Sequence, residues 1–194
     1  NSDGKPDMIT ANSGSNDVSI LLNSCSAAKG NLFDYNGDRK TDYSVFRPST
    51  TQYFVQTLNQ FGAAKVLGRP NDVLVPADFN GDRKTDFAYY RPESGLWVVQ
   101  ENSFGFGRPI YFLQFGLPED IPMPADYDGD GKADLAVFRP SEGNWYIRRS
   151  TDNALQTIRF GSVGDKPVAA DFDGDTIADI AVYRPSTGVW YILR

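Results

Sequence analysis

The sequence predicts an all-β protein, a β-propeller-like array of four-stranded antiparallel blades, and three observations support this. An Asp-rich loop of nine residues recurs four times without gaps, with successive starts 44, 48 and 45 residues apart. The same succession of short strands and turns follows every copy. No stretch of about 11 residues shows helical periodicity. Four strands in about 45 residues is the size of a propeller blade.

The loop keeps oxygen-bearing side chains at positions 1, 3, 5 and 9 and a glycine at position 4. Its copies are Asp34–Asp42, Asp78–Asp86, Asp126–Asp134 and Asp171–Asp179. Side chains at alternating positions converge only if the backbone curls around a centre, and glycine permits that curl. Carboxylates held this close repel one another unless a cation lies between them.

Calcium fits this donor set best, because Ca²⁺ takes six to eight oxygen ligands in flexible geometry. Mg²⁺ demands a tighter octahedron, and the absence of His argues against softer metals. Ordinary Asp/Asn/Gly turns are the alternative for a single copy, but four copies in register disfavour it. The predicted ligand positions hold 14 of the 25 acidic residues, and four Ca²⁺ ions would change the net charge from −6 to about +2.

Each loop is followed by an apolar strand that ends in an aromatic-Arg-Pro step, then by a turn and an aromatic strand. The steps are Phe46-Arg47-Pro48, Tyr90-Arg91-Pro92, Phe138-Arg139-Pro140 and Tyr183-Arg184-Pro185. The aromatic strands are 52–55, 96–99, 144–147 and 189–192. Three repeats then lead to a Phe-Gly pair, at Phe61-Gly62, Phe115-Gly116 and Phe160-Gly161. With the strand that precedes each loop, every unit has four expected strands.

The beginning of the chain departs from this pattern. We expect residues 1–23 to be a partial repeat, 24–30 a linker and 31–194 four repeats, because Asn1–Asp7 fits only the last seven loop positions. The partial repeat could complete the final blade and close a ring, form most of a fifth blade, or pair with a neighbouring molecule. These three alternatives stay open, because pairing of the end strands is a three-dimensional question.

Composition excludes several classes of protein. The chain has no His and one Cys, Cys25, which excludes Ser-His-Asp and Cys-His catalysis and an internal disulfide. No nucleophile–base set is visible, and the paired acids are committed to metal, so we expect no enzymatic activity. An acidic chain argues against nucleic acid, and no apolar run approaches the ~18 residues of a membrane-spanning helix.

The loop and its flanking strands resemble the FG-GAP/VCBS repeat, the blade unit of integrin α-subunit heads and of many bacterial secreted proteins. The resemblance implies a calcium site between the first and second strands of each blade. Integrin loops carry Gly at position 6, where this chain has Gly131 but also Arg39, Arg83 and Thr176. The match is therefore closer to bacterial forms, and a bacterial source is expected. Full integrin-type propellers have seven blades, more than the repeats found here.

We accordingly expect about four Ca²⁺ sites. The side-chain ligands would be Asp34, Asn36, Asp38, Asp42, Asp78, Asn80, Asp82, Asp86, Asp126, Asp128, Asp130, Asp134, Asp171, Asp173, Asp175 and Asp179. Position 7 would contribute its backbone carbonyl, from Lys40, Lys84, Lys132 and Ile177.

Two other recurring residues allow either binding or packing. The Arg of each aromatic-Arg-Pro step could bind a sugar or carboxylate, but we favour pairing with its own loop's acids or capping of a strand. Trp97, Trp145 and Trp190 could contact a ligand as sugar-stacking platforms, but their repeated position favours packing of blade against blade.

The expected function is that of a non-catalytic binding or adhesion module for a glycan or protein, with calcium holding the blades rigid. We expect it outside the cell or at the cell surface, because extracellular calcium would fill loops of modest affinity. The alternative is a structural subunit that self-associates through its terminal strands into a fibre or surface array.

Overall fold

The computed structural model describes residues 10–11, 19–20, 33–57, 60–66, 68–102 and 110–194. These residues form strands and turns, and none of them lies in a helix. All strand pairs are antiparallel and join neighbours in the sequence. The all-β prediction is therefore confirmed. Among the described residues, no helix has the length and hydropathy to cross a membrane.

Four sheets of three or four strands follow a short two-stranded one, and we call these four sheets blades 1 to 4. The two-stranded sheet contains β1 (Thr10–Ala11) and β2 (Ser19–Ile20). Blade 1 contains β3 (Tyr43–Arg47), β4 (Gln52–Thr57) and β5 (Gln60–Val66). Blade 2 contains β6 (Val73–Leu74), β7 (Phe87–Arg91), β8 (Leu96–Gln100) and β9 (Ile110–Gln114). Blade 3 contains β10 (Ile121–Pro122), β11 (Leu135–Arg139), β12 (Asn144–Arg148) and β13 (Leu155–Arg159). Blade 4 contains β14 (Lys166–Ala170), β15 (Asp179–Arg184) and β16 (Val189–Leu193).

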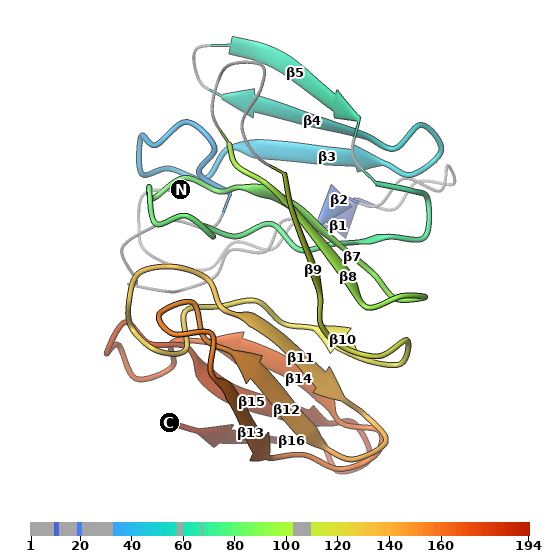
Figure 1. Cartoon of the computed structure of the whole chain (residues 1–194), viewed down its shortest axis with the longest axis vertical. Coiled ribbons are helices and arrows are strands. Elements are labelled where there is room, and N and C mark those ends of the chain that lie inside the picture. The colour runs from blue at the N-terminus through green and yellow to red at the C-terminus, as the bar shows by residue number, and fades with distance from the viewer. Residues whose placement is uncertain (1–9, 12–18, 21–32, 58–59, 67, 103–109) are drawn as a thin grey trace.

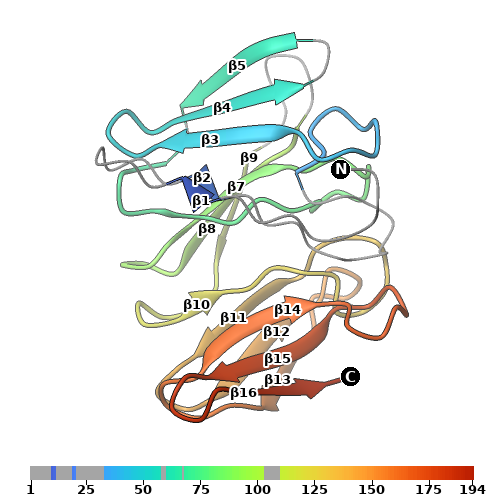
Figure 2. The ribbon, with the colours of Figure 1, turned by 180° about the vertical axis from the view of Figure 1, so that it is seen from behind.

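The blades follow one another in chain order. Blade 1 lies at one end of the long axis, blade 2 beside it, and blades 3 and 4 toward the other end (Figure 1). The view from behind shows the same separation of the first and last blades (Figure 2). The described sheets thus form an open array. Most of the expected partial repeat and all of the expected linker lie outside the described residues.

In every blade we count the strand after the Asp loop as the second strand (β3, β7, β11 and β15) and the aromatic strand as the third (β4, β8, β12 and β16). These two strands pair in one register. Tyr90 lies opposite Trp97, Phe138 opposite Trp145, and Tyr183 opposite Trp190. The ring centroids of these pairs are 5.2–5.4 Å apart, a favourable spacing for cross-strand aromatic pairs. The aromatic-Arg-Pro step and the aromatic strand are therefore two halves of one hairpin.

Close packing at the tip of this hairpin explains the glycine in its turn and the Phe-Gly pair that faces it. Gly95 has a φ of +63°, and a Cβ at this residue would lie 2.3 Å from the carbonyl oxygen of Gly116. The amide of Phe115 donates to the carbonyl of Gly95 at 2.8 Å, and the Trp97 indole Nε1 donates to the carbonyl of Phe115 at 2.8 Å. The Phe-Gly segment therefore locks the third strand to the fourth.

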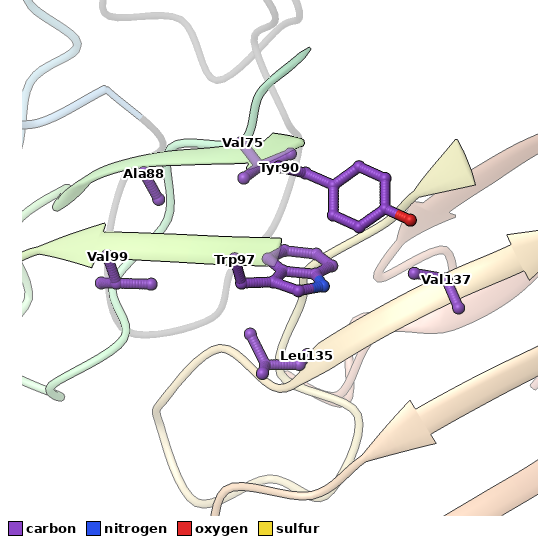
Figure 3. Close-up of a cluster of buried hydrophobic side chains, with 7 residues drawn as sticks. All are labelled: Val75, Ala88, Tyr90, Trp97, Val99, Leu135 and Val137. Atoms are coloured by element: carbon purple, nitrogen blue, oxygen red, sulfur yellow. The ribbon is translucent and has the colours of Figure 1, made fainter. Parts of the chain in front are cut away.

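The core lies between the blades. Figure 3 shows the Trp97 indole beside Tyr90 of its own blade and facing Leu135 and Val137 of blade 3. Equivalent clusters join blade 1 to blade 2 through Tyr53 and blade 3 to blade 4 through Trp145. Each junction buries an aromatic third strand of one blade against the second strand of the next.

Arginines of the aromatic-Arg-Pro steps are held by buried acids. Arg91, Arg139 and Arg184 each donate two hydrogen bonds, of 2.8–3.0 Å, to one carboxylate: Asp72, Asp120 and Asp165 respectively. These acids precede the first strand of the blade, outside the metal loops. The expected pairing with the loop's own acids is therefore wrong for these three blades, although the role is structural. All four arginines also lie over an aromatic ring of their own blade, at 4.4–5.5 Å, and for Arg47 this ring is Phe54.

Candidate metal centre

The four Asp loops occupy the expected place in each blade. The loops of blades 2, 3 and 4 lie between the first and second strands, and the loop of blade 1 immediately precedes β3. Each blade therefore presents one loop at the same end of its second strand.

The Asp at position 1 shapes the loop. Its two carboxylate oxygens accept the amide N–H groups of positions 4 and 6, at 2.6–2.9 Å in all four copies. Position 3 then accepts the amide of position 5, and position 5 accepts the amide of position 7. The alternating oxygens predicted from the sequence thus curl the backbone around themselves.

Position 6 has a left-handed backbone in every loop. Its φ is +66° at Arg39, +67° at Arg83, +87° at Gly131 and +79° at Thr176. Only glycine adopts this conformation without steric cost, and a β-branched residue there is an outlier. Sequence reasoning identified the substitutions at this position but not the strain that they introduce.

The Asp at position 9 anchors the loop to the sheet. One of its oxygens accepts the amide of position 2 at 2.8–3.0 Å in all four loops. The other oxygen of Asp86 accepts a hydrogen bond from the backbone N–H of Asn102 at 2.7 Å. The other oxygen of Asp134 accepts one from the backbone N–H of Ser150 at 2.6 Å. Both carboxylates are fully buried, and burial raises the pKa of each to about 6.

The third and fourth loops bring three carboxylates together. Oxygens of Asp126, Asp128 and Asp130 lie within 4.8 Å of one another, and so do those of Asp171, Asp173 and Asp179. Asp134 and Asp175 are not in these clusters. Loops 1 and 2 carry Asn at position 3 and hold no cluster of three acids among the described residues. The donors are all hard oxygens at close range, which suits a hard divalent cation.

Carboxylates of the first three loops also have raised pKa values. Burial is the main cause for Asp42, Asp78 and Asp126, and neighbouring loop carboxylates raise their pKa values further. Burial and mutual repulsion therefore disfavour the ionised form of these three acids. A bound cation would supply a compensating charge.

Two hydroxyl groups from outside the third loop donate hydrogen bonds to its carboxylates. Ser150 donates from Oγ to Asp130 Oδ2 at 2.7 Å, and Thr151 donates from Oγ1 to Asp128 Oδ2. Both residues follow β12, and each lies at least 20 residues beyond the acid that it contacts. The Asp pattern contains no signal for them, because these contacts depend on how the end of β12 folds back.

Neighbouring loops are linked to one another. The position 8 amide of one loop donates to the position 1 carbonyl of the preceding loop, at 2.7 Å each time. The pairs are Thr85 to Asp34, Ala133 to Asp78 and Ala178 to Asp126. The four loops therefore form a row across the blades.

The side chain at position 7 makes a second contact between neighbouring loops. The side chains of Lys84, Lys132 and Ile177 lie over the position 4 glycine of the preceding loop. A Cβ on Gly37 would be 2.9 Å from Lys84 Cε, for example. Position 7, expected to bind metal through its carbonyl, thus also closes the neighbouring loop with its side chain. Lys40 occupies this position in the first loop and is exposed.

The three tryptophans differ in exposure. Trp97 and Trp145 are fully buried between blades, whereas Trp190 is 52% exposed. The burial of Trp97 and Trp145 favours the packing interpretation and leaves neither ring face open for stacking on a sugar.

Comparison with known proteins matches the chain to a family model. The family model described as an FG-GAP-like repeat matches residues 78–137 and 126–182, which together span more than half of the chain. No curated protein and no solved structure matches the chain.

Proposed function

The chain belongs to the FG-GAP-like repeat family, and from this premise we propose that it is an extracellular, calcium-binding scaffold that acts as a non-catalytic binding module. The observation that carries the calcium assignment is the convergence of oxygen donors in four loops that share the same hydrogen bonds. Bound calcium would supply positive charge that offsets the repulsion between clustered carboxylates.

The row of loops gives calcium a structural role. Each loop is hydrogen-bonded to the next and covered by its position 7 side chain. Order in one loop is therefore coupled to order in its neighbours and to the packing of the blades. This coupling supports a rigid scaffold held by several ions.

A groove between blades 2 and 3 supports the binding role. Tyr111 and Leu113 of β9 line it together with Glu101 and Arg148. Tyr111 donates from its hydroxyl to Glu101 at 3.0 Å. Aromatic and charged groups at one concave surface are what a sugar requires for stacking and hydrogen bonding. We assign the partner class as glycan on this basis, and a Tyr111→Ala variant tested on a glycan array checks it.

Removal of calcium tests the scaffold role. We expect the melting temperature to fall when EDTA replaces excess calcium. At a free calcium concentration of about 100 times the Kd of a site, the ion bound there contributes about 2.7 kcal/mol to stability. Calorimetric titration should give about four sites, and magnesium should substitute poorly. Asp126→Asn should reduce the calcium-dependent shift.

The matched control is Asp152→Asn, which changes an exposed acid outside the loops that pairs with Arg149. It should leave the calcium-dependent shift unchanged. Melting curves that overlay in EDTA and in calcium would overturn the calcium assignment.

A further inference from the structure

The groove between blades 2 and 3 is lined by an aromatic ring and a cation that come from different blades. These are Tyr111 of β9 and Arg148 of β12. Tyr111 lies opposite Val99 in its sheet, and Arg148 lies opposite Leu135. Val99 and Leu135 both belong to the hydrophobic cluster between the two blades. Because residues paired directly across neighbouring strands share one face of a sheet, Tyr111 and Arg148 face the same gap.

This combination departs from the repeat. The residues equivalent to Arg148 in blades 1, 2 and 4 are Gln56, Gln100 and Leu193. The residues equivalent to Tyr111 in blades 1 and 3 are Ala63 and Gln156. The first aromatic position of the third strand, which builds the junctions, is by contrast aromatic in every blade. Stacking of the blades therefore requires neither Tyr111 nor Arg148, and their meeting at one junction indicates a role specific to it.

Arg148 also differs from other arginines of the chain in its surroundings. Arg91, Arg139 and Arg184, and the adjacent Arg149, each pair with one aspartate. Arg148 is partly buried, but within the described chain its guanidinium forms no hydrogen bond, ion pair or ring contact. A guanidinium presents a planar fork of donors that matches a carboxylate with two parallel hydrogen bonds. The groove therefore offers this fork to a ligand.

The other groups in the groove suit a sugar with a single negative charge. Tyr111 is 47% exposed, and the hydrogen bond from its hydroxyl to Glu101 holds the ring in one orientation. Asn153 lines the same groove, and its amide can both donate to and accept from sugar hydroxyls. Glu101 adds a negative charge close to the cation, which disfavours a doubly charged group such as phosphate. A carboxylate on a sugar ring matches both the fork of Arg148 and this charge balance.

We propose that the groove between blades 2 and 3 binds a carboxylate-bearing sugar, such as a uronic acid, with its carboxylate on Arg148 and its ring against Tyr111. This inference rests on the proposed glycan-binding function and narrows its ligand class. Calcium enters only through the scaffold that holds the two blades in place.

The test uses a glycan array that carries uronic-acid oligosaccharides, their carboxyl-reduced counterparts and sulfated oligosaccharides, probed in excess calcium. We expect wild type to bind uronic-acid members and to bind their carboxyl-reduced counterparts about 10-fold or more weakly, because a charge-assisted hydrogen bond is lost. Arg148→Gln should weaken binding of the uronic-acid members by a similar factor. In this variant, reduction of the sugar carboxylate should have no further effect, since the two changes remove the same contact.

Arg148→Gln introduces the residue that blades 1 and 2 carry at this position, so the fold accommodates it, and an unchanged calcium-dependent melting shift verifies this. Arg159→Gln is the matched control, because Arg159 is exposed on β13 and does not line the groove. It removes the same charge and should bind as wild type does.

Three outcomes would overturn the inference. Equal binding of uronic-acid and carboxyl-reduced members, unaffected by Arg148→Gln, would show that Arg148 reads no carboxylate, while the glycan-binding function stands. Binding of sulfated members alone would replace the carboxylate with a sulfate ester. Binding of no member would overturn the glycan assignment together with this inference, and the calcium-dependent melting shift would still test the scaffold role separately.

Discussion

Trp145 and Trp190 occupy the same position of the same repeat and have different surroundings. Both pair across the hairpin with an aromatic residue, at 5.4 Å and 5.2 Å. Trp145 is fully buried beneath blade 4 and donates from Nε1 to the Phe160 carbonyl at 2.9 Å, whereas Trp190 is half exposed. The repeat sequence therefore fixes the hairpin, but the neighbouring blade determines how much each hairpin contributes to stability. This is the behaviour of a one-dimensional array of units and junctions.

Truncation of the two tryptophans should show the largest difference. Trp145→Ala removes a fully buried indole and should lower the free energy of unfolding by about 3–5 kcal/mol. Trp190→Ala removes a half-exposed side chain and should cost about 1 kcal/mol. Urea unfolding of the two variants and of wild type measures both values. Equal losses would show that the blade junction contributes little, and would break the comparison.

Removing the buried acids should give the next largest effect. Asp120 pairs with Arg139, which is 14% exposed, and Asp165 pairs with Arg184, which is 28% exposed. Loss of either acid leaves a cation unpaired, and for buried pairs this costs about 3–5 kcal/mol. We expect Asp120→Ala to approach that range and Asp165→Ala to cost less, because water reaches Arg184 more easily. Asp152→Ala, at an exposed pair, should cost at most about 1 kcal/mol.

The Asp165 pair also predicts a pH dependence. Hydrogen bonds from Arg184 hold the pKa of Asp165 below its ordinary value. A carboxyl with a lowered folded-state pKa stabilises the fold above its unfolded pKa of about 3.9, and that contribution is lost as the pH falls through the folded-state pKa. The stability gap between wild type and Asp165→Ala should therefore be constant at neutral pH and shrink below about pH 4. Chemical unfolding at a series of pH values measures the gap, and a gap that widens in acid would contradict the assignment.

Features encoded within a few residues could be predicted from the sequence. The β-strands, the blade length and the curl of the Asp loops each follow from a short pattern repeated four times. Asp72, Asp120 and Asp165 were missed, although each lies six residues before its loop, because their arginine partners lie 19 residues later. The contacts between loops were missed for the same reason. Thr85 and Asp34 lie in different blades, and only the folded array brings them together.

The strained position 6 offers the smallest and most local test of how the loops differ. Loops 3 and 4 have the same backbone there, with φ +87° at Gly131 and +79° at Thr176. Thr176→Gly should stabilise the protein by about 1 kcal/mol, since relief of left-handed strain of about 1–2 kcal/mol exceeds the added flexibility of the unfolded chain. The reverse change, Gly131→Thr, should destabilise by about 1–2 kcal/mol. Measuring both in EDTA removes any change in calcium affinity, and a Thr176→Gly variant less stable than wild type would mean that Thr176 makes contacts worth more than its strain.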